Sequence, residues 1–210
     1  MTPPRVGVDG FAMYIIELLM VLGAYALGSL STGYYLVRLR TGQDIRLLGS
    51  GSAGSRNVAR SVGLAASATT LAGDAAKGAL AAGTAVLLGL ETWAIMLVVG
   101  AVVAGHIWPP QLQLRGGKGL ATVMGAVLIF DYVLVLIAYA VAAVTLALSR
   151  RFTLSGLVAV ALTPLAALLI GRTQAEVVGL SALAAVILFS HRDNIQSIVR
   201  GAHGPSSEGA

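Results

Sequence analysis

The sequence predicts an all-α integral membrane protein with seven transmembrane helices, an outside amino terminus and a cytoplasmic carboxyl terminus. The first observation behind this prediction is composition: 57% of the 210 residues are hydrophobic and only 11% are charged, with a mean hydropathy of +0.85. Soluble domains carry roughly 25% charged residues. This chain has too little polar surface to cover a water-soluble globule, so lipid is the solvent that its composition fits. The other two observations are the spacing of apolar stretches and the distribution of positive charges.

Apolar stretches recur along the chain and are separated by polar segments. Most of them approach the roughly 20 residues that a helix needs to cross a bilayer, although the fourth is short. Asp131 either interrupts one long helix or separates the fourth stretch from the fifth. The seven stretches are Met13–Val37, Leu64–Leu90, Thr92–Trp108, Leu120–Phe130, Tyr132–Leu148, Leu154–Ile170 and Ala175–Ser190.

The positive charges favour seven spans over six. With seven spans and an outside amino terminus, the positive-inside rule is satisfied at every crossing. A six-span alternative would put Arg150 and Arg151 outside and leave Asp131 in the middle of the bilayer, which is unfavourable. In the seven-span arrangement, the inner loops hold Arg38, Arg40, Arg46, Arg56, Arg60, Arg115, Lys118, Arg150, Arg151, Arg192 and Arg200. The outer side holds Arg5 and Arg172 with Asp9, Glu17, Glu91, Asp131 and Glu176.

The length of the chain fits one domain. We expect residues 1–12 to be extracytoplasmic, residues 13–200 to form a single seven-helix membrane domain, and residues 201–210 to be a disordered cytoplasmic tail. The segment Ala24-Tyr25-Ala26 looks like a signal-peptide cleavage site, but Arg5 alone is a weak charged region and the apolar run is long enough to span. We therefore interpret 13–37 as one retained helix.

Charge and cysteine content exclude several classes of function. The net charge of +5 comes from 14 Lys and Arg against 9 Asp and Glu, an excess that reflects topology first and an anionic ligand second. No basic tract with interleaved aromatics is present, which disfavours nucleic acid as a partner. The chain has no cysteine, so thiolate metal sites and a covalent thioester are excluded. We expect no metal and no cofactor.

The second apolar stretch contains two opposite charges. Asp74 and Lys77 are three residues apart and so lie on one helical face. Charged residues inside a membrane are functional candidates, and a buried structural ion pair is an equally good interpretation. Both alternatives stay open at this point.

The most informative polar segment lies between the first two apolar stretches. Its glycines let backbone N–H groups approach a ligand closely, its serines add hydroxyl donors, and its arginines add fixed positive charge, which together are the ingredients of a phosphate site. The alternative is a flexible interfacial loop whose arginines meet lipid headgroups. A G-x-G-x-x-G match is present but follows a membrane helix instead of a strand, so it does not indicate a dinucleotide site. The candidate binding residues are Gly49, Ser50, Gly51, Ser52, Gly54, Arg56, Asn57 and Arg60.

Three further polar segments are predicted on the same side. In one of them, Gly116-Gly117-Lys118-Gly119 would place an ammonium beside backbone donors at the start of a helix. His106, before this turn, is either a general base or a hydrogen-bonded histidine at the interface. The other two segments carry Thr153 after a pair of arginines, and His191 with Asn194 at positions i and i+3. Together these groups indicate a small polyanion as ligand, namely phosphate esters that meet a lipid.

Motifs in these segments resemble the bacterial acyl-phosphate:glycerol-3-phosphate acyltransferases. The resemblance extends from about Ala24 to Gly201. It rests on Gly28-Ser29 before Gly33-Tyr34, Asp44-Ile45-Arg46 before Gly49-Ser50-Gly51, Asn57-x-x-Arg60, Asp74-x-x-Lys77-Gly78, Gly105-His106 followed by Gly116-Gly117-Lys118-Gly119-x-Ala121-Thr122, and His191-Arg192-Asp193-Asn194-Ile195. The chain departs from the family pattern at Ser31, Thr32, Ser52 and Arg56.

The resemblance implies a fold, a reaction and a location. The fold is seven membrane helices with the motifs at the cytoplasmic face of the bacterial inner membrane. The reaction moves an acyl chain from acyl phosphate to the 1-hydroxyl of glycerol 3-phosphate, giving lysophosphatidic acid and phosphate. It implies neither metal nor covalent enzyme intermediate, and it implies a possible partner enzyme that supplies acyl phosphate.

The resemblance and the chemistry of the loops together assign roles to residues. The alternatives to an acyltransferase are a membrane transporter for an organic phosphate and a subunit that binds an anionic lipid. The catalytic candidates are His106, His191, Asn194, Ser50 and Lys118, and the substrate-binding candidates are Gly49, Ser50, Gly51, Ser52, Gly54, Arg56, Asn57, Arg60, Gly116, Gly117, Lys118, Gly119, Thr153 and Asn194.

Overall fold

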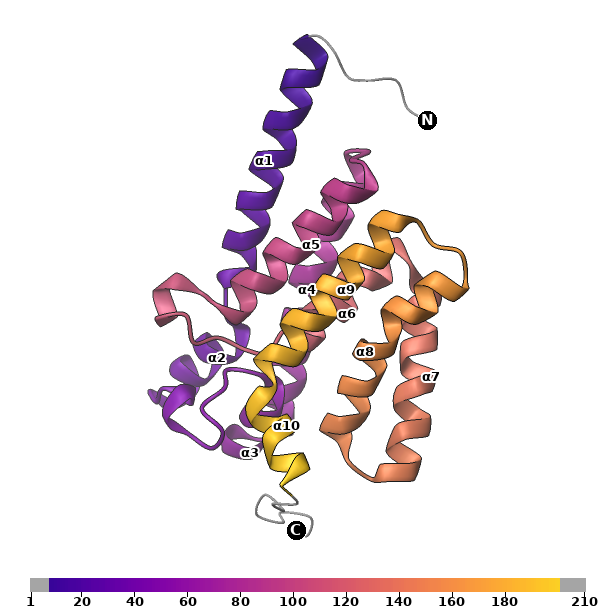
Figure 1. Ribbon diagram of the computed structural model, residues 1–210. Helices are drawn as coiled ribbons and strands as arrows, with labels where there is room; N and C mark the ends of the chain where they lie inside the picture. The colour runs from indigo at the N-terminus through magenta and orange to yellow at the C-terminus, as the bar shows by residue number, and fades with distance from the viewer. Residues whose placement is uncertain (1–7, 201–210) are drawn as a thin grey trace. The chain divides into compact units, whose positions relative to one another are not determined.

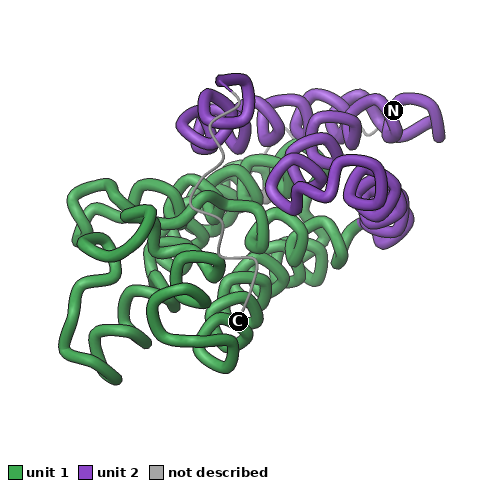
Figure 2. Tube along the Cα trace, turned by 90° about the horizontal axis from the view of Figure 1, so that it is seen from below, with its two compact units in different colours: residues 1–130 green, residues 131–210 purple. Residues whose placement is uncertain are grey.

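The computed structural model describes residues 8–200, and this part of the chain contains helices and no strand (Figure 1). The expected all-α class is therefore confirmed. The chain divides into two compact units at Phe130–Asp131 (Figure 2). Most of the segment expected to be extracytoplasmic (1–7 of 1–12) and the whole of the expected tail (201–210) lie outside the described residues, and α1 already begins at Val8.

In the first unit, α4 packs against α6, and α1 packs against α5. Glycines allow close approach at the first of these interfaces. A Cβ on Gly78 would collide with the carbonyl oxygen of Thr122, and one on Gly125 would collide with that of Ala75. The elements are α1 Val8–Ser29, α2 Thr32–Thr41, the short 3-10 helix η1 Ile45–Leu47, α3 Ser55–Val62, α4 Leu64–Leu87, α5 Thr92–Ile107, the 3-10 helix η2 Pro110–Leu112 and α6 Leu120–Phe130.

The first apolar stretch is not one helix, which corrects the expectation for 13–37. It is broken into α1 and α2 at residues 30–31. Side chains bind the backbone carbonyls of residues 28–30. Lys77 Nζ donates to the carbonyls of Gly28 and Leu30, both at 3.0 Å. Gln111 Nε2 donates to the carbonyl of Ser29 at 2.6 Å. Because these side chains hydrogen-bond to the carbonyls, the helix can break without leaving carbonyl oxygens unsatisfied in an apolar environment.

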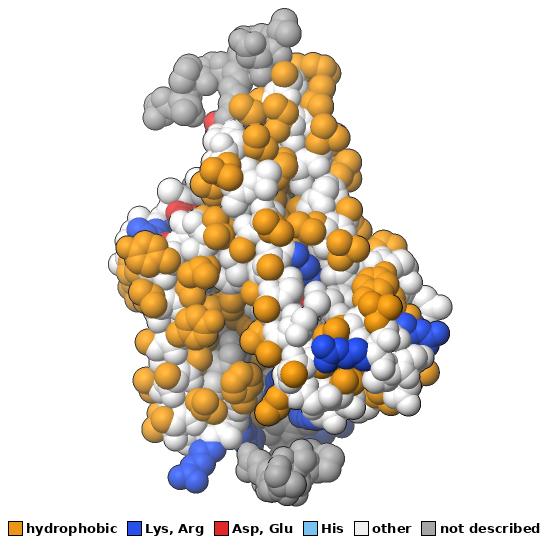
Figure 3. All heavy atoms as spheres, turned by 180° about the vertical axis from the view of Figure 1, so that it is seen from behind, with side chains coloured by type: hydrophobic (Ala, Val, Ile, Leu, Met, Phe, Trp, Pro, Cys, Tyr) orange, Lys and Arg blue, Asp and Glu red, His pale blue; other side chains and the backbone are white. Residues whose placement is uncertain are grey.

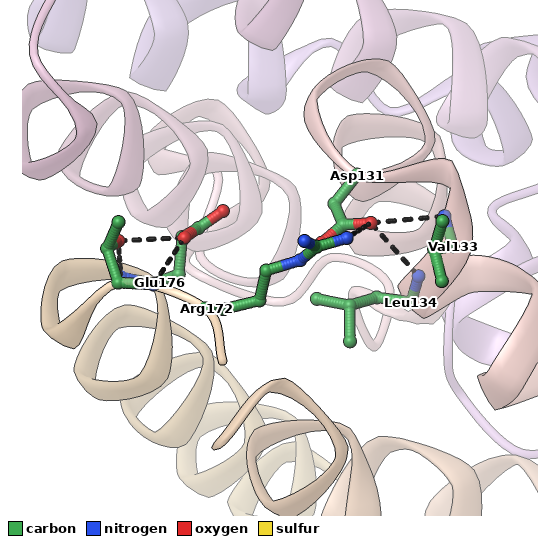
Figure 4. A network of polar contacts seen from close by, with 6 residues as sticks. Asp131, Val133, Leu134, Arg172 and Glu176 are labelled. Atoms are coloured by element: carbon green, nitrogen blue, oxygen red, sulfur yellow. Dashed lines mark hydrogen bonds and ion pairs between the residues drawn. The ribbon is translucent and has the colours of Figure 1, made fainter. Parts of the chain in front are cut away.

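The second unit contains α7 Tyr132–Ser149, α8 Phe152–Leu169, α9 Gln174–Ser190 and α10 Arg192–Val199, with α8 packed against α7 and α9. Asp131 caps α7 by accepting from the backbone N–H groups of Val133 and Leu134. Its other oxygen lies 2.6 Å from Nε of Arg172 (Figure 4). The prediction that Asp131 separates two helices is confirmed.

A capping box begins α9. Thr173 Oγ1 accepts from the backbone N–H of Glu176, and the Glu176 carboxylate accepts from the backbone N–H of Thr173 (Figure 4). This reciprocal pair satisfies two of the N–H groups that a helix start leaves without partners.

Between residues 8 and 200, four helical segments are long and apolar enough to cross a membrane, or five if the bent pair α9–α10 counts as one span. The four are Gly10–Thr41, Thr92–Leu112, Tyr132–Ser149 and Phe152–Leu169, and α6 is a shorter apolar helix. Hydrophobic side chains cover much of the face seen in Figure 3. On α1, large side chains such as Phe11 and Leu19 are more than half exposed. Such surface is compatible with lipid.

Candidate active site

The Gly-rich segment after η1 is organised by the side chain of Asn57, which lies in the first turn of α3 and is 2% exposed. Its Nδ2 donates to the carbonyls of Ile45, Leu48 and Ser52 at 3.2, 2.9 and 2.9 Å. Its Oδ1 accepts from the backbone N–H of Ser50 at 2.9 Å. The hydrogen-bonding groups of Asn57 are thus engaged by the loop itself, and this residue sets the shape of the loop.

Two glycines of this loop have the left-handed backbone that favours glycine. The φ angle of Gly49 is +52° and that of Gly51 is +71°. A Cβ on Gly49 would also collide with Oδ1 of Asn57. The loop then leads through Gly54 into α3, so the N–H groups at the positive end of this helix lie next to it. A loop of this kind presents fixed backbone donors to an anion.

The second Gly-rich segment is bonded directly to the first. Its own shape comes from two backbone hydrogen bonds, Gly116 N to Ile107 O and Gly117 N to His106 O, both 3.0 Å. The carbonyl of Gly116 then accepts from the backbone N–H of Ala53 at 3.2 Å. The structure therefore brings Gly49–Gly54 and Gly116–Gly119, two segments far apart in the sequence, to one place in the first unit.

His106 lies beneath these loops and is only 3% exposed. Its Nδ1 is 3.5 Å from Oδ1 of Asp74. Its Nε2 packs so closely on Gly117 that a Cβ there would collide with the ring. Both ring nitrogens thus face protein groups. This geometry favours a buried structural histidine over a general base, although its Nδ1 faces Asp74 without making the hydrogen bond that the sequence interpretation expected.

Asp44, in the loop before α3, is paired with Arg46. Both of its oxygens accept from Arg46, with Nε–Oδ1 at 3.0 Å and a terminal nitrogen to Oδ2 at 2.6 Å. The side chains of Arg56 and Arg60 are exposed on α3. Partial removal of the Arg56 guanidinium from water, and then the positive charge of Arg60, lower the pKa of Arg56. The two cations, at positions i and i+4 of α3, are therefore close enough to interact.

The remaining predicted site residues belong to the second unit. Thr153 lies in the first turn of α8, and His191 and Asn194 lie around the 66° bend between α9 and α10. Nδ1 of His191 is 2.8 Å from the carbonyl oxygen of Ile187. The same ring nitrogen lies 3.2 Å from Oγ of Ser190.

A model of the family described as glycerol-3-phosphate acyltransferase matches residues 18–201, a range that contains both Gly-rich segments, His191 and Asn194. The chain belongs to this acyltransferase family. It is 46% identical over 185 residues to glycerol-3-phosphate acyltransferase 1 of Desulfitobacterium hafniense (strain Y51), covering 88% of this chain and 92% of that protein. It is 38% identical over 189 residues to the glycerol-3-phosphate acyltransferase of Clostridioides difficile (strain 630), with 88% and 92% covered.

Two solved structures of a glycerol 3-phosphate acyltransferase share the fold. The crystal structure of the integral membrane enzyme PlsY (YgiH) in its glycerol 3-phosphate form matches with a TM-score of 0.84 and 29% identity, over 90% of this chain and 94% of that one. Its lysophosphatidic acid form matches with a TM-score of 0.82 and 28% identity over the same shares. This protein is accordingly an all-α, multi-pass membrane acyltransferase.

Arg46 of this acyltransferase has a structural role at the site that its place in the sequence did not predict. Besides binding Asp44, it donates to the carbonyl of Leu112 at 2.7 Å, and its guanidinium lies 5.1 Å from the ring centre of Tyr34. It thereby ties the segment before the first Gly-rich loop to η2, which precedes the second. The Asp-x-Arg spacing in a polar loop was the available signal, but the partner in η2 is 66 residues away.

Proposed function

We propose that this protein transfers an acyl group from acyl phosphate to the 1-hydroxyl of glycerol 3-phosphate. The products are lysophosphatidic acid and phosphate. The observation that carries the proposal is the pair of Gly-rich segments, shaped by Asn57 and bonded to each other through Ala53 and Gly116, in a chain of the glycerol-3-phosphate acyltransferase family. Two phosphorylated substrates need two sets of anion-binding groups close together, and these segments offer them.

In this reaction the hydroxyl oxygen attacks the acyl carbonyl carbon, and the bond from that carbon to the phosphate oxygen breaks. Arg60, Lys118 and the backbone of Gly49–Ser55 bind phosphate groups and offset the negative charge that develops on the carbonyl oxygen. Ser50 orients a hydroxyl group, and the hydroxyl proton goes to the leaving phosphate. Thr153, His191 and Asn194, which belong to the second unit, remain candidates from the sequence for orienting hydroxyl groups and moving a proton.

We further propose seven spans in residues 13–200, forming one membrane domain with an outside amino terminus and the Gly-rich segments on the cytoplasmic face of the bacterial inner membrane. The asymmetry of Lys and Arg among the loops supports this arrangement. A reporter that is active only in the cytoplasm, fused after Gly201, is expected to be active. Activity of an export-dependent reporter at the same position would contradict the seven-span topology.

The direct experiment is an assay of the purified protein with acyl phosphate and labelled glycerol 3-phosphate. We expect labelled lysophosphatidic acid and one phosphate released per acyl group transferred. A separate enzyme would supply the acyl phosphate in the cell. Binding or vesicle uptake of glycerol 3-phosphate without formation of labelled product would instead identify a binding subunit or a transporter.

A further inference from the structure

Three polar side chains meet in the interior of the first unit and are not used by the proposed chemistry. They are Asp74 and Lys77 on α4 and His106 on α5, which are 2%, 4% and 3% exposed. Asp74 Oδ1 lies 3.0 Å from Lys77 Nζ and 3.5 Å from His106 Nδ1. A single carboxylate oxygen therefore faces both a cation and an imidazole.

Lys77 connects this cluster to the break between α1 and α2. Its ammonium donates to the carbonyls of Gly28 and Leu30 in addition to facing Asp74. An ammonium has three donors and no acceptor; two hydrogen bonds go to these carbonyls, and the contact with Asp74 Oδ1 at 3.0 Å is an ion pair. The broken helix thus depends on Lys77 for two of its carbonyls, and Asp74 offsets the buried positive charge.

His106 connects the same cluster to the Gly-rich segments. Its carbonyl accepts from Gly117, its ring packs on the Cα of Gly117, and the neighbouring Gly116 accepts from Ala53 of the first loop. A continuous series of contacts therefore runs from the α1–α2 break through Lys77, Asp74 and His106 to both loops. The contacts in this series are hydrogen bonds, the ion pair of Asp74 with Lys77, direct packing, and the approach of Asp74 Oδ1 to His106 Nδ1 at 3.5 Å, which makes no hydrogen bond.

We propose that Asp74 is a positioning residue, which holds Lys77 and His106 so that the α1–α2 break and the two Gly-rich segments keep one geometry. It does not touch substrate in this scheme, because it is enclosed between α4 and α5. An ion pair that served only stability could be replaced by apolar side chains without functional loss. A positioning carboxylate could not, since without it the Lys77 ammonium and His106 Nδ1 would no longer face the oxygen that fixes their places.

The kinetic test rests on the proposed acyl transfer and uses paired substitutions. Asp74→Leu with Lys77→Met removes both charges and all hydrogen-bonding groups, whereas Asp74→Asn with Lys77→Gln removes the charges and keeps polar groups. We expect the apolar pair to lower kcat/KM for both substrates about 10- to 100-fold, as loss of a supporting contact does, and the amide pair to recover part of that loss. Wild-type kinetics in the apolar pair, or equal loss in the two pairs, would overturn the proposal.

Asp131→Asn is the matched control. Asp131 is also buried, 4% exposed, and pairs with one cation, Arg172, while asparagine still caps α7. We expect this variant to unfold at a lower temperature than the wild type and to keep wild-type kinetics. A kinetic loss as large as that of the Asp74 variants would show that any buried carboxylate has this effect, and would also overturn the proposal.

A second measurement uses the wild-type protein, so it depends neither on the folding of an Asp74 variant nor on enzymatic activity. The chain has three histidines, and 15N-histidine NMR of the wild-type protein in detergent micelles can report their tautomers, with His106→Gln used to assign His106. We expect Nδ1 of His106 to carry a proton at neutral pH, since it faces a carboxylate oxygen. A ring protonated only on Nε2 would overturn the positioning role. Failure of the wild type to make lysophosphatidic acid would count against the proposed function and leave this result standing.

Discussion

Asn57→Ala is the substitution whose effect on the first Gly-rich loop can be worked out most fully from the structure. It removes an amide whose two N–H groups are shared among three carbonyl oxygens and whose Oδ1 accepts one hydrogen bond. Counted as three full hydrogen bonds of about 0.5–1.5 kcal/mol net each, the loss is at most about 4.5 kcal/mol. Gly49 and Ser50 are exposed, and water will replace part of the loss.

We therefore expect the loop of the Asn57→Ala variant to lose about 2–3 kcal/mol of ordering free energy. At about 1.4 kcal/mol per factor of ten, kcat/KM should fall roughly 30- to 150-fold for both substrates, because the loop is displaced as a whole. Initial rates against each substrate, with thermal unfolding in the same detergent, measure the two effects. Asn57→Asp should be no better than alanine, since it places a carboxylate against three carbonyl oxygens.

Thr84→Ala is the matched control for the loss of a hydrogen bond. Thr84 Oγ1 donates only within α4, to Leu80 O at an exposed position, so kinetics should be unchanged. If Asn57→Ala stays within about twofold of wild-type kcat/KM, the loop does not depend on this amide. An effect confined to one substrate would instead indicate direct contact between Asn57 and that substrate.

Three further predictions concern charge and packing at the Gly-rich segments. Arg60→Ala and Lys118→Ala should each lower kcat/KM at least about tenfold to a hundredfold, since a charge-assisted contact is worth roughly 1.5–3 kcal/mol; unchanged kinetics in both would assign these cations to lipid headgroups. Arg56→Thr should raise KM for one substrate and weaken the salt dependence of that KM, and no change, or equal change for both, would mark Arg56 as a surface substitution. Gly117→Ala should lower both the unfolding temperature and kcat, because its Cβ collides with the imidazole that packs on it, whereas Gly100→Ala on α5, where nothing lies within 4 Å, should do neither.

Two helix breaks show which features of the fold could be predicted from the sequence and which could not. The break at Asp131 was predictable because its cause is local: a charged residue between two apolar stretches that caps the next helix through residues 133 and 134. The break between α1 and α2 was not predictable. The groups that make it tolerable, Lys77 and Gln111, lie 47 to 82 residues along the chain from the carbonyls they bind.

The sequence by itself determined the solvent, the chemistry and the family. Composition requires lipid, the Gly-, Ser- and Arg-rich segments have the donors that phosphate needs, and motifs in order along most of the chain identify the acyltransferase family. These conclusions depend on which residues are present and on their order, and both can be read without a fold.

Only the tertiary structure decided which polar groups the protein uses for itself. Asn57 hydrogen-bonds within its own loop, and Asp44 binds Arg46. His106 faces Asp74 and packs on Gly117. In a sequence each of these residues is equally a ligand contact or a structural one, because side-chain chemistry is the same in both roles. The distinction depends on which atoms lie within hydrogen-bonding distance after folding, and packing brings together partners from 2 to 82 positions apart along the chain.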